Sequence, residues 1–107
     1  MYLSPRAARL LKDLEDSHRA LMAEAAADDA ARHALRAVYD AFAAAMAGLD
    51  EERLIAPPGP EEWSVAQVLE HVVEHDRKYR ELQERGLVHY IEHGLEHARQ
   101  AWLLRSP

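Results

Sequence analysis

Cysteine is absent from the 107-residue chain, and its absence excludes disulfides, thiolate nucleophiles and cysteine-ligated zinc sites. Histidine, aspartate and glutamate are therefore the side chains that remain as metal ligands. Long apolar runs are absent as well, because no stretch approaches the ~18 residues of a membrane-spanning helix. The first residues become charged too soon for a secretory signal. We therefore expect a cytoplasmic protein with no membrane partner.

Basic residues are also scarce relative to acidic ones. The chain has 13 Lys and Arg against 19 Asp and Glu, which gives a formal net charge of -6 at pH 7. Because no basic cluster offsets this charge, we expect no nucleic-acid partner. The length and the lack of internal repeats predict a single domain over residues 1–107.

Hydrophobic residues recur every three to four positions, and this spacing predicts four helices at about residues 4–25, 29–49, 64–85 and 87–104. Ser4 before Pro5 is typical of a helix start, and Asp28 or Asp29 can cap the second helix. No segment has the alternation of a strand. The fold class predicted is all-α, and an antiparallel four-helix bundle is its simplest form.

The segment 52–63, "ERLIAPPGPEEW", has three prolines and a glycine in four positions and predicts a stiff crossover without a helix. Ser64 follows it, and Gln67 lies three residues further on, the spacing of a capping box. The connection near residues 85–86 is so short that the last two predicted helices should be antiparallel neighbours.

Seven histidines are present, and five of them lie between positions 71 and 97. Two H-x-x-x-H pairs stand out: "HVVEH" contains His71 and His75, and "HGLEH" contains His93 and His97. At 1.5 Å per residue, all four lie about 10–21 Å from the predicted turn, so they can meet at one height of an antiparallel pair. Periodicity turns His75 inward and leaves His71 at the edge of the apolar arc. It places His93 and His97 inward or at the rim of a cleft.

Imidazoles that converge in this way suit zinc, nickel, iron or copper, and three of them leave a coordination position open. The alternative is that these histidines are structural and are hydrogen-bonded to neighbours, since buried polar groups need partners. Three other histidines are assigned no metal. We expect His89 and His33 at the surface, and His18 at the edge of the core beside a bonded neighbour.

Two motifs resemble the DinB-like superfamily. The first is "PPGPEEWSVAQVLEHVVEHD", a Pro/Gly loop followed by Trp63, the cap Ser64, and His71 eight residues after the tryptophan. The second is "HGLEHARQ" with His93 and His97. The resemblance covers roughly residues 28–104. It implies a helical bundle in which His71, His93 and His97 bind a divalent metal such as zinc, nickel or iron.

The resemblance moves the preferred ligand of the third predicted helix from His75 to His71. We keep His75 as an alternate ligand or as a group that orients a ligand, together with Asp76. The resemblance also implies an activity, either thiol-dependent transfer with a small thiol or hydrolysis. Asp76, Tyr79 and Tyr90 are the candidates for moving protons in such a reaction.

The chain departs from the family in its length. The segment between the two motifs normally holds a further helix, and here it is reduced to a tight turn. Either the helix at 4–25 or a second subunit should take that place, so we expect a homodimer built on the helices at 4–25 and 29–49. The competing hypothesis is a metal-free dimerisation or ligand-binding module without enzymatic activity.

Overall fold

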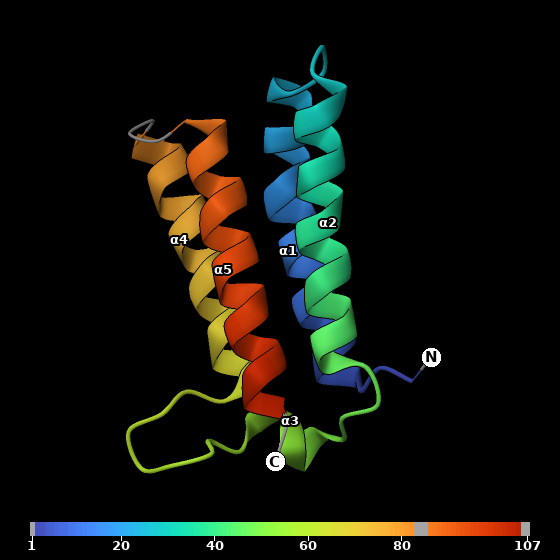
Figure 1. The fold of residues 1–107 in the computed structure, drawn as a ribbon, viewed down its shortest axis with the longest axis vertical. Helices are drawn as coiled ribbons and strands as arrows, with labels where there is room; N and C mark the ends of the chain where they lie inside the picture. The colour runs from blue at the N-terminus through green and yellow to red at the C-terminus, as the bar shows by residue number, and fades with distance from the viewer. Residues whose placement is uncertain (1, 83–85, 106–107) are drawn as a thin grey trace.

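The computed structural model describes residues 2–82 and 86–105, except for the side chains of 79–82. In this part of the chain every regular element is a helix: α1 (Pro5–Glu24), α2 (Asp29–Met46), α3 (Glu51–Ile55), α4 (Val65–Leu82) and α5 (Leu87–Arg105) (Figure 1). The all-α prediction is confirmed. The end predicted for the third long helix, at residue 85, lies outside the described residues.

The predicted caps begin the long helices. The Ser4 hydroxyl accepts the Ala7 N–H at 3.1 Å, and an Asp28 carboxylate oxygen accepts the Ala31 N–H at 3.0 Å. At α4 the Ser64 hydroxyl accepts the backbone N–H of Gln67 at 3.1 Å. The Gln67 side chain in turn accepts the N–H of Ser64 at 2.8 Å, which completes the capping box. These bonds satisfy backbone donors that a helix start otherwise leaves without partners.

The short helix α3 corrects the prediction of a crossover without a helix. Asp50 caps it, accepting the Arg53 N–H at 2.8 Å, and two glutamates in its first turn favour the positive helix end. Leu54 of α3 is fully buried in the main core. The prolines therefore affect only the loop that follows Ile55, and they do not prevent a single capped turn before it.

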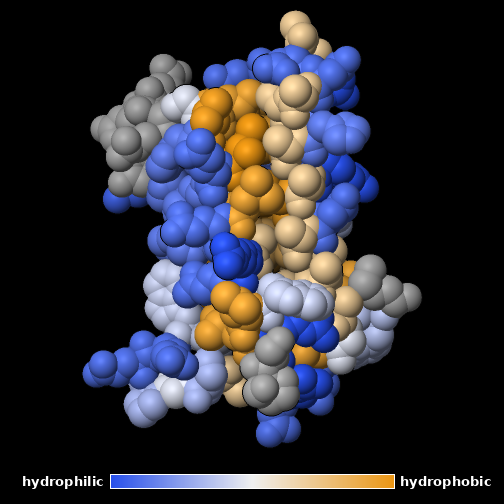
Figure 2. Space-filling model, viewed as in Figure 1, coloured by the Kyte–Doolittle hydropathy of each residue, from blue (hydrophilic) through white to orange (hydrophobic). Residues whose placement is uncertain are grey.

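The core runs along the inside of the bundle, with Leu14, Phe42, Leu69 and Val72 among its fully buried side chains. A smaller apolar cluster of Leu21, Leu35 and Tyr90 lies apart from the main one. The surface has its own apolar feature. Figure 2 shows a stripe of apolar residues along the face formed by α2 and α5.

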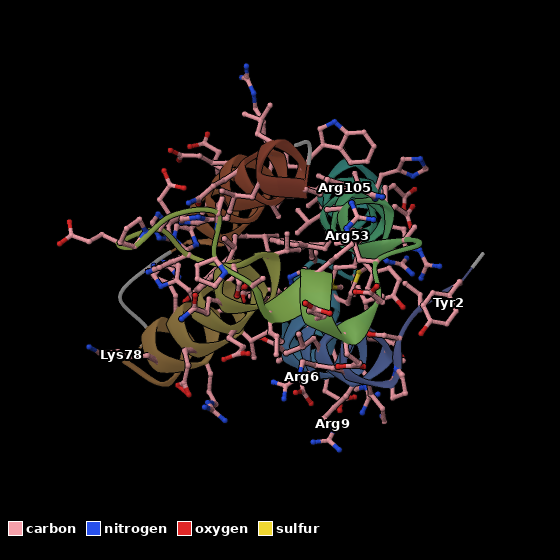
Figure 3. All side chains as sticks on the ribbon, turned by 90° about the horizontal axis from the view of Figure 1, so that it is seen from below. Tyr2, Arg6, Arg9, Arg53, Lys78 and Arg105 are labelled. Atoms are coloured by element: carbon pink, nitrogen blue, oxygen red, sulfur yellow. The ribbon has the colours of Figure 1, made fainter. Side chains whose placement is uncertain are left out.

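The four long helices form a closed ring, in which α1 packs against α2, α2 against α5, α5 against α4, and α4 against α1. Figure 3 looks along this ring from below, with α3 lying across its end. The helices α1 and α2 form one antiparallel hairpin, and α4 and α5 form the other (Figure 1). The segment containing α3 crosses the ring diagonally from α2 to α4. Within one chain, α1 thus supplies the fourth helix.

At one point α5 approaches α2 unusually closely. A Cβ atom added at Gly94 would lie only 2.7 Å from Cγ1 of Val38. Glycine therefore lets α5 lie closer to α2 at this level than any other residue would. Because Gly94 follows His93 directly, this contact also sets the position of the histidine-bearing part of α5.

Candidate metal centre

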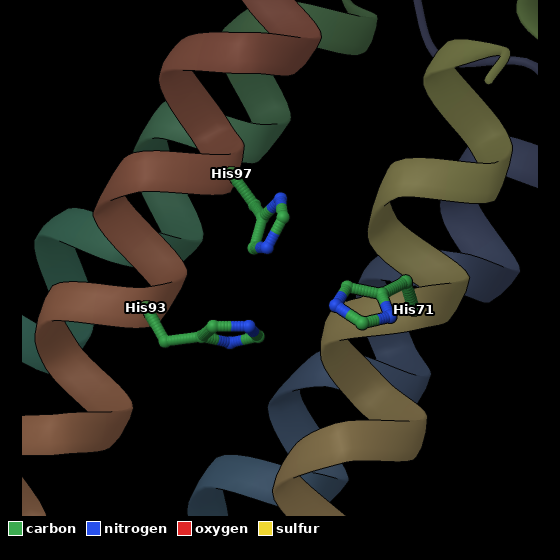
Figure 4. A group of neighbouring side chains, drawn as sticks. All are labelled: His71, His93 and His97. Carbon is green, nitrogen blue, oxygen red and sulfur yellow. The ribbon is translucent and has the colours of Figure 1, made fainter. Parts of the chain in front are cut away.

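Three histidines from two helices meet between α4 and α5 (Figure 4). His71 comes from α4, whereas His93 and His97 lie one turn apart on α5. One ring nitrogen from each lies within 4.8 Å of those of the other two, so this half-buried group could hold a metal ion. The ring centroids are 5.3 Å apart for His71 and His93 and 4.8 Å apart for His71 and His97. The structure thus brings together the three residues that the resemblance selected.

His75 also turns inward, as periodicity predicted. Its ring stacks on that of His93 with centroids 3.8 Å apart, and its Nδ1 lies 3.2 Å from an Asp76 carboxylate oxygen. His75, Asp76 and His93 form a second group with donor atoms within 4.8 Å of one another. His71 and His75 therefore both face α5, and the inward position of one does not exclude that of the other.

The prediction for His89 was wrong. It was placed at the solvent surface, but its ring is half-buried and its Nε2 lies 3.3 Å from Nε2 of His75. Periodicity describes the faces of a helix in isolation, whereas the neighbouring helix α4 decides which of these faces is covered. His33 is exposed, as predicted.

Asp76 is fully buried, with 0% of its surface exposed. One of its oxygens faces His75, and the other lies 3.7 Å from Nε2 of His18, which α1 brings in from across the bundle. His18 was predicted at the core edge beside a bonded neighbour. It is buried with Asp76 as its neighbour, but the 3.7 Å separation is too long for a hydrogen bond. The pairing itself was missed by the sequence analysis. Its only signal was that each of these polar residues falls in the apolar stripe of its own helix.

Of the two tyrosines predicted as candidates for moving protons, only Tyr90 has a side chain within the described part of the structure. Tyr90 is buried, and its ring centroid lies 6.4 Å from that of His75 and 5.8 Å from that of His89. It therefore borders the second group. Tyr79 belongs to α4, but its side chain lies outside those described.

The surroundings favour neutral imidazoles. Burial, followed by the neighbouring His75 and His97, lowers the pKa of His93 to about 4. Burial and the proximity of His97 also lower the pKa of His71. Both rings are therefore neutral near pH 7, and the neutral form is the one that offers a nitrogen lone pair to a metal.

The hydrogen bonds around the group leave nitrogen atoms available to a ligand. Nδ1 of His97 donates to Oε1 of Gln100 at 2.7 Å, which directs the lone pair to Nε2. Nδ1 of His93 is buried and has no hydrogen-bond partner in the described part of the chain. A buried polar atom without a hydrogen-bond partner is uncommon, so this nitrogen is a candidate for binding a ligand.

A cavity of about 410 Å³ opens beside the histidines. It is lined by Glu61, Glu62, Trp63, His97, Gln100 and Leu104. The Trp63 indole lies against His71, with ring centroids 4.9 Å apart, and extends towards His97 at 6.5 Å. The loop before α4 thus provides one wall of a space that reaches the histidine group.

Comparison with known proteins agrees with this geometry. The family model of the DinB superfamily matches residues 34–101, which is more than half of the chain and includes all three histidines of the first group. No curated protein and no solved structure matches the chain. None of the helices in the described residues is long and apolar enough to cross a membrane. On the family match, the chain belongs to the DinB superfamily.

Proposed function

We propose that the protein binds one divalent metal ion through His71, His93 and His97 and uses it in thiol-dependent transfer or in hydrolysis of a small molecule. The observation that carries the proposal is the convergence of three ring nitrogens within 4.8 Å. The lowered pKa values of His71 and His93 support it, because protons compete with a metal for the same lone pairs.

The donor set fits a late transition metal. Imidazole suits zinc, nickel and iron(II), and three protein ligands leave at least one position for water or substrate. Gln100 orients His97, and the buried Nδ1 of His93 would be explained by a bound ion or by a water held with it. A metal with such an open position lowers the pKa of a bound thiol or water and makes it a nucleophile near neutral pH.

The side chains around the three histidines would position a substrate and restrict its charge. Trp63 lies against His71 at one side of the histidine group. Glu61 and Glu62 are exposed at the cavity, so we expect a neutral or cationic substrate to be preferred over an anionic one. The buried Asp76 faces Nδ1 of His75 and orients that ring. Tyr90 is the nearest described hydroxyl-bearing ring to His75 and stays a candidate for proton transfer.

Elemental analysis of untagged protein tests the metal. The purified chain should retain about one divalent ion after dialysis, whereas the His93→Ala/His97→Ala variant should retain none. His71→Ala should lower the affinity sharply. The matched control is His33→Ala, which removes an exposed histidine of α2 and should leave the metal content unchanged. A wild type that stays metal-free after addition of zinc, nickel and iron(II) would overturn the proposal.

Activity is tested separately on the metal-loaded protein. Transfer of a small thiol to electrophilic acceptors and hydrolysis of ester and amide substrates are screened in parallel. Turnover that disappears in His93→Ala/His97→Ala and survives in His33→Ala would support an enzyme. Bound metal without turnover in either screen would reduce the proposal to metal binding alone.

A second candidate function, self-association, rests on the face of α2 and α5 (Figure 2). Leu95 and Trp102 of α5 are 41% and 49% exposed, and with Ala41 and Ala44 of α2 they line a shallow groove. We propose a second copy of the chain as the occupant, because the large side chains of one copy can fill the groove over the alanines of the other, as a two-fold interface requires.

This face differs from the dimer interface expected from the sequence, which used the first two helices. None of the large exposed hydrophobic residues among the described side chains belongs to α1. Light scattering should give the mass of a dimer for the wild type and of a monomer for Leu95→Glu. Glu96→Gln, on the exposed side of the same turn, is the control and should remain dimeric. A monomeric wild type would refute this candidate.

A further inference from the structure

The cavity beside the three-histidine group combines an exposed indole with two carboxylates. Trp63 is 40% exposed, and the exposed residues Glu61 and Glu62 directly precede it in the loop before α4. All three line the cavity of about 410 Å³, and no lysine or arginine is among the described residues that line it. The two carboxylates therefore have no basic partner in this cavity, and their charge is available to a ligand.

The loop holds these side chains in a restricted arrangement. The N–H of Glu62 donates to the carbonyl oxygen of Gly59 at 3.2 Å, and prolines on both sides of Gly59 restrict the backbone. The capping box at the start of α4 then fixes Ser64, the residue after Trp63. A loop restricted in this way loses little conformational freedom when a ligand binds.

An indole and carboxylates together are suited to an organic cation. A quaternary or protonated amine within about 6 Å of an indole centroid is attracted by the negative face of the ring. The apolar Leu104, which also lines the cavity, suits the methyl or methylene groups around such a charge. A bare metal cation would instead need several converging oxygen ligands, and an indole supplies none.

The same cavity reaches the candidate metal centre. His97 is part of its lining, and the planes of His97 and Trp63 are inclined by only 25°, with ring centroids 6.5 Å apart. Gln100 also lines it, and because its side-chain oxygen accepts from His97, its NH₂ group remains as a donor for an uncharged oxygen of a ligand. A small molecule held by its cationic end at Trp63 would thus extend towards the three histidines.

We propose that this cavity recognises an organic ammonium group through the Trp63 indole and the carboxylates of Glu61 and Glu62, and that the substrate of the metal centre carries such a group. The substrate role rests on the proposed function, because it requires a reaction at the three histidines. Recognition of the cation does not, because its groups belong to the loop. The two carboxylates also offset the positive charge that a bound divalent ion adds nearby.

Titration with choline, a small quaternary ammonium ion, tests the recognition. The untagged Trp102→Phe protein retains Trp63 as its only tryptophan, so its fluorescence reports on the cavity. Choline should change this fluorescence saturably in the metal-free protein and again after addition of zinc. The matched neutral probe is 3,3-dimethylbutan-1-ol, which has the shape of choline without its charge. It should bind about 5-fold more weakly or less tightly still, because it lacks the attraction to the ring and the carboxylates.

Variants identify the groups that bind the probe. In the same background, Glu61→Gln/Glu62→Gln should weaken choline binding by about 5-fold or more. The control Glu92→Gln/Glu96→Gln removes the same charge from exposed positions of α5 outside the cavity lining and should leave the affinity unchanged. Saturation-transfer NMR on the choline methyl signal should show a loss of binding in Trp63→Leu and partial retention in Trp63→Phe. Far-UV circular dichroism verifies that each variant is folded.

The outcomes separate the two proposals. Absence of a saturable response to choline would overturn the ammonium site, and so would equal binding of the neutral alcohol or an unchanged affinity in Glu61→Gln/Glu62→Gln. Zinc binding without choline binding would overturn the ammonium site alone and leave the proposed function in place. Choline binding by a protein that retains no divalent ion would support the recognition but overturn the proposed function, and with it the substrate role of the cation.

Discussion

Replacing Gly94 with alanine tests how closely α5 is held against α2. The added Cβ would lie 2.7 Å from Cγ1, 3.3 Å from Cγ2 and 3.6 Å from Cβ of Val38. Carbon atoms in contact prefer about 3.5–4.0 Å, so the two helices would have to separate by roughly 1 Å at this point. Rotation of Val38 offers little relief, because a valine in a helix has one strongly preferred rotamer.

The expected change in stability is the difference between two opposing effects. Overpacking of this kind lowers the free energy of unfolding by about 1–3 kcal/mol. Alanine in place of glycine inside a helix raises it by about 1 kcal/mol. We therefore expect Gly94→Ala to lower the free energy of unfolding by up to about 2 kcal/mol. Urea denaturation of the metal-free protein, followed by far-UV circular dichroism, measures this change.

Val38→Ala supplies the matched control, because it removes the methyl groups that the new Cβ would meet. The double variant should be more stable than the sum of the two single changes predicts, by about 0.5–3 kcal/mol of coupling. If Gly94→Ala alone stabilises the protein by the ~1 kcal/mol that helix propensity predicts, the reasoning from the close approach is refuted. Additivity in the double variant would refute it independently.

Three further predictions concern the site and its helices. Gln100→Ala should weaken zinc binding at the three-histidine site by about 10-fold or more, measured by chelator competition, because His97 loses its orienting acceptor; an unchanged affinity would contradict this role. Ser64→Ala should lower the free energy of unfolding by about 1 kcal/mol in urea denaturation through loss of the α4 cap. The thermal midpoint of the metal-free protein should fall as the pH is lowered from about 6.5 to about 4. His71 and His93 have lower pKa values in the folded protein than in the unfolded one, so the unfolded state binds more protons in this range. A midpoint that is constant or rises as the pH is lowered would contradict the lowered pKa values.

The helix starts were predictable because their signals are local, whereas the second long helix ends at Met46 and not at residue 49 as predicted. Ser4, Asp28 and Ser64 each bond to a backbone N–H three residues further on, so a short stretch of sequence contains the whole interaction. The helix α3 was missed for a related reason. Its five residues are too few to show a hydrophobic period, and the prolines after it dominated the interpretation of the segment, although Asp50 and the glutamates after it were a readable cap signal.

The candidate site was predictable in part. The H-x-x-x-H spacing on α5 and the family motif before α4 selected three histidines, and the structure brings them together. The place of His89 could not be read in the same way, because α5 is apolar around much of its circumference and its pattern does not decide which face α4 covers. The approach of His18 to Asp76 depends on the ring order of the bundle, which places α1 beside α4. No spacing within one helix contains that information.

All four imidazoles of the two groups come from one hairpin, α4 and α5, and this has a consequence for folding kinetics. Contacts within a hairpin are close in sequence and form early, whereas the packing of α5 on α2 closes a much longer loop. An ion could therefore bind while α1 and α2 are still undocked and would then stabilise the folding transition state as well as the native protein. In that case zinc should accelerate refolding more than it slows unfolding, and the histidine hairpin would act as a metal-dependent folding nucleus.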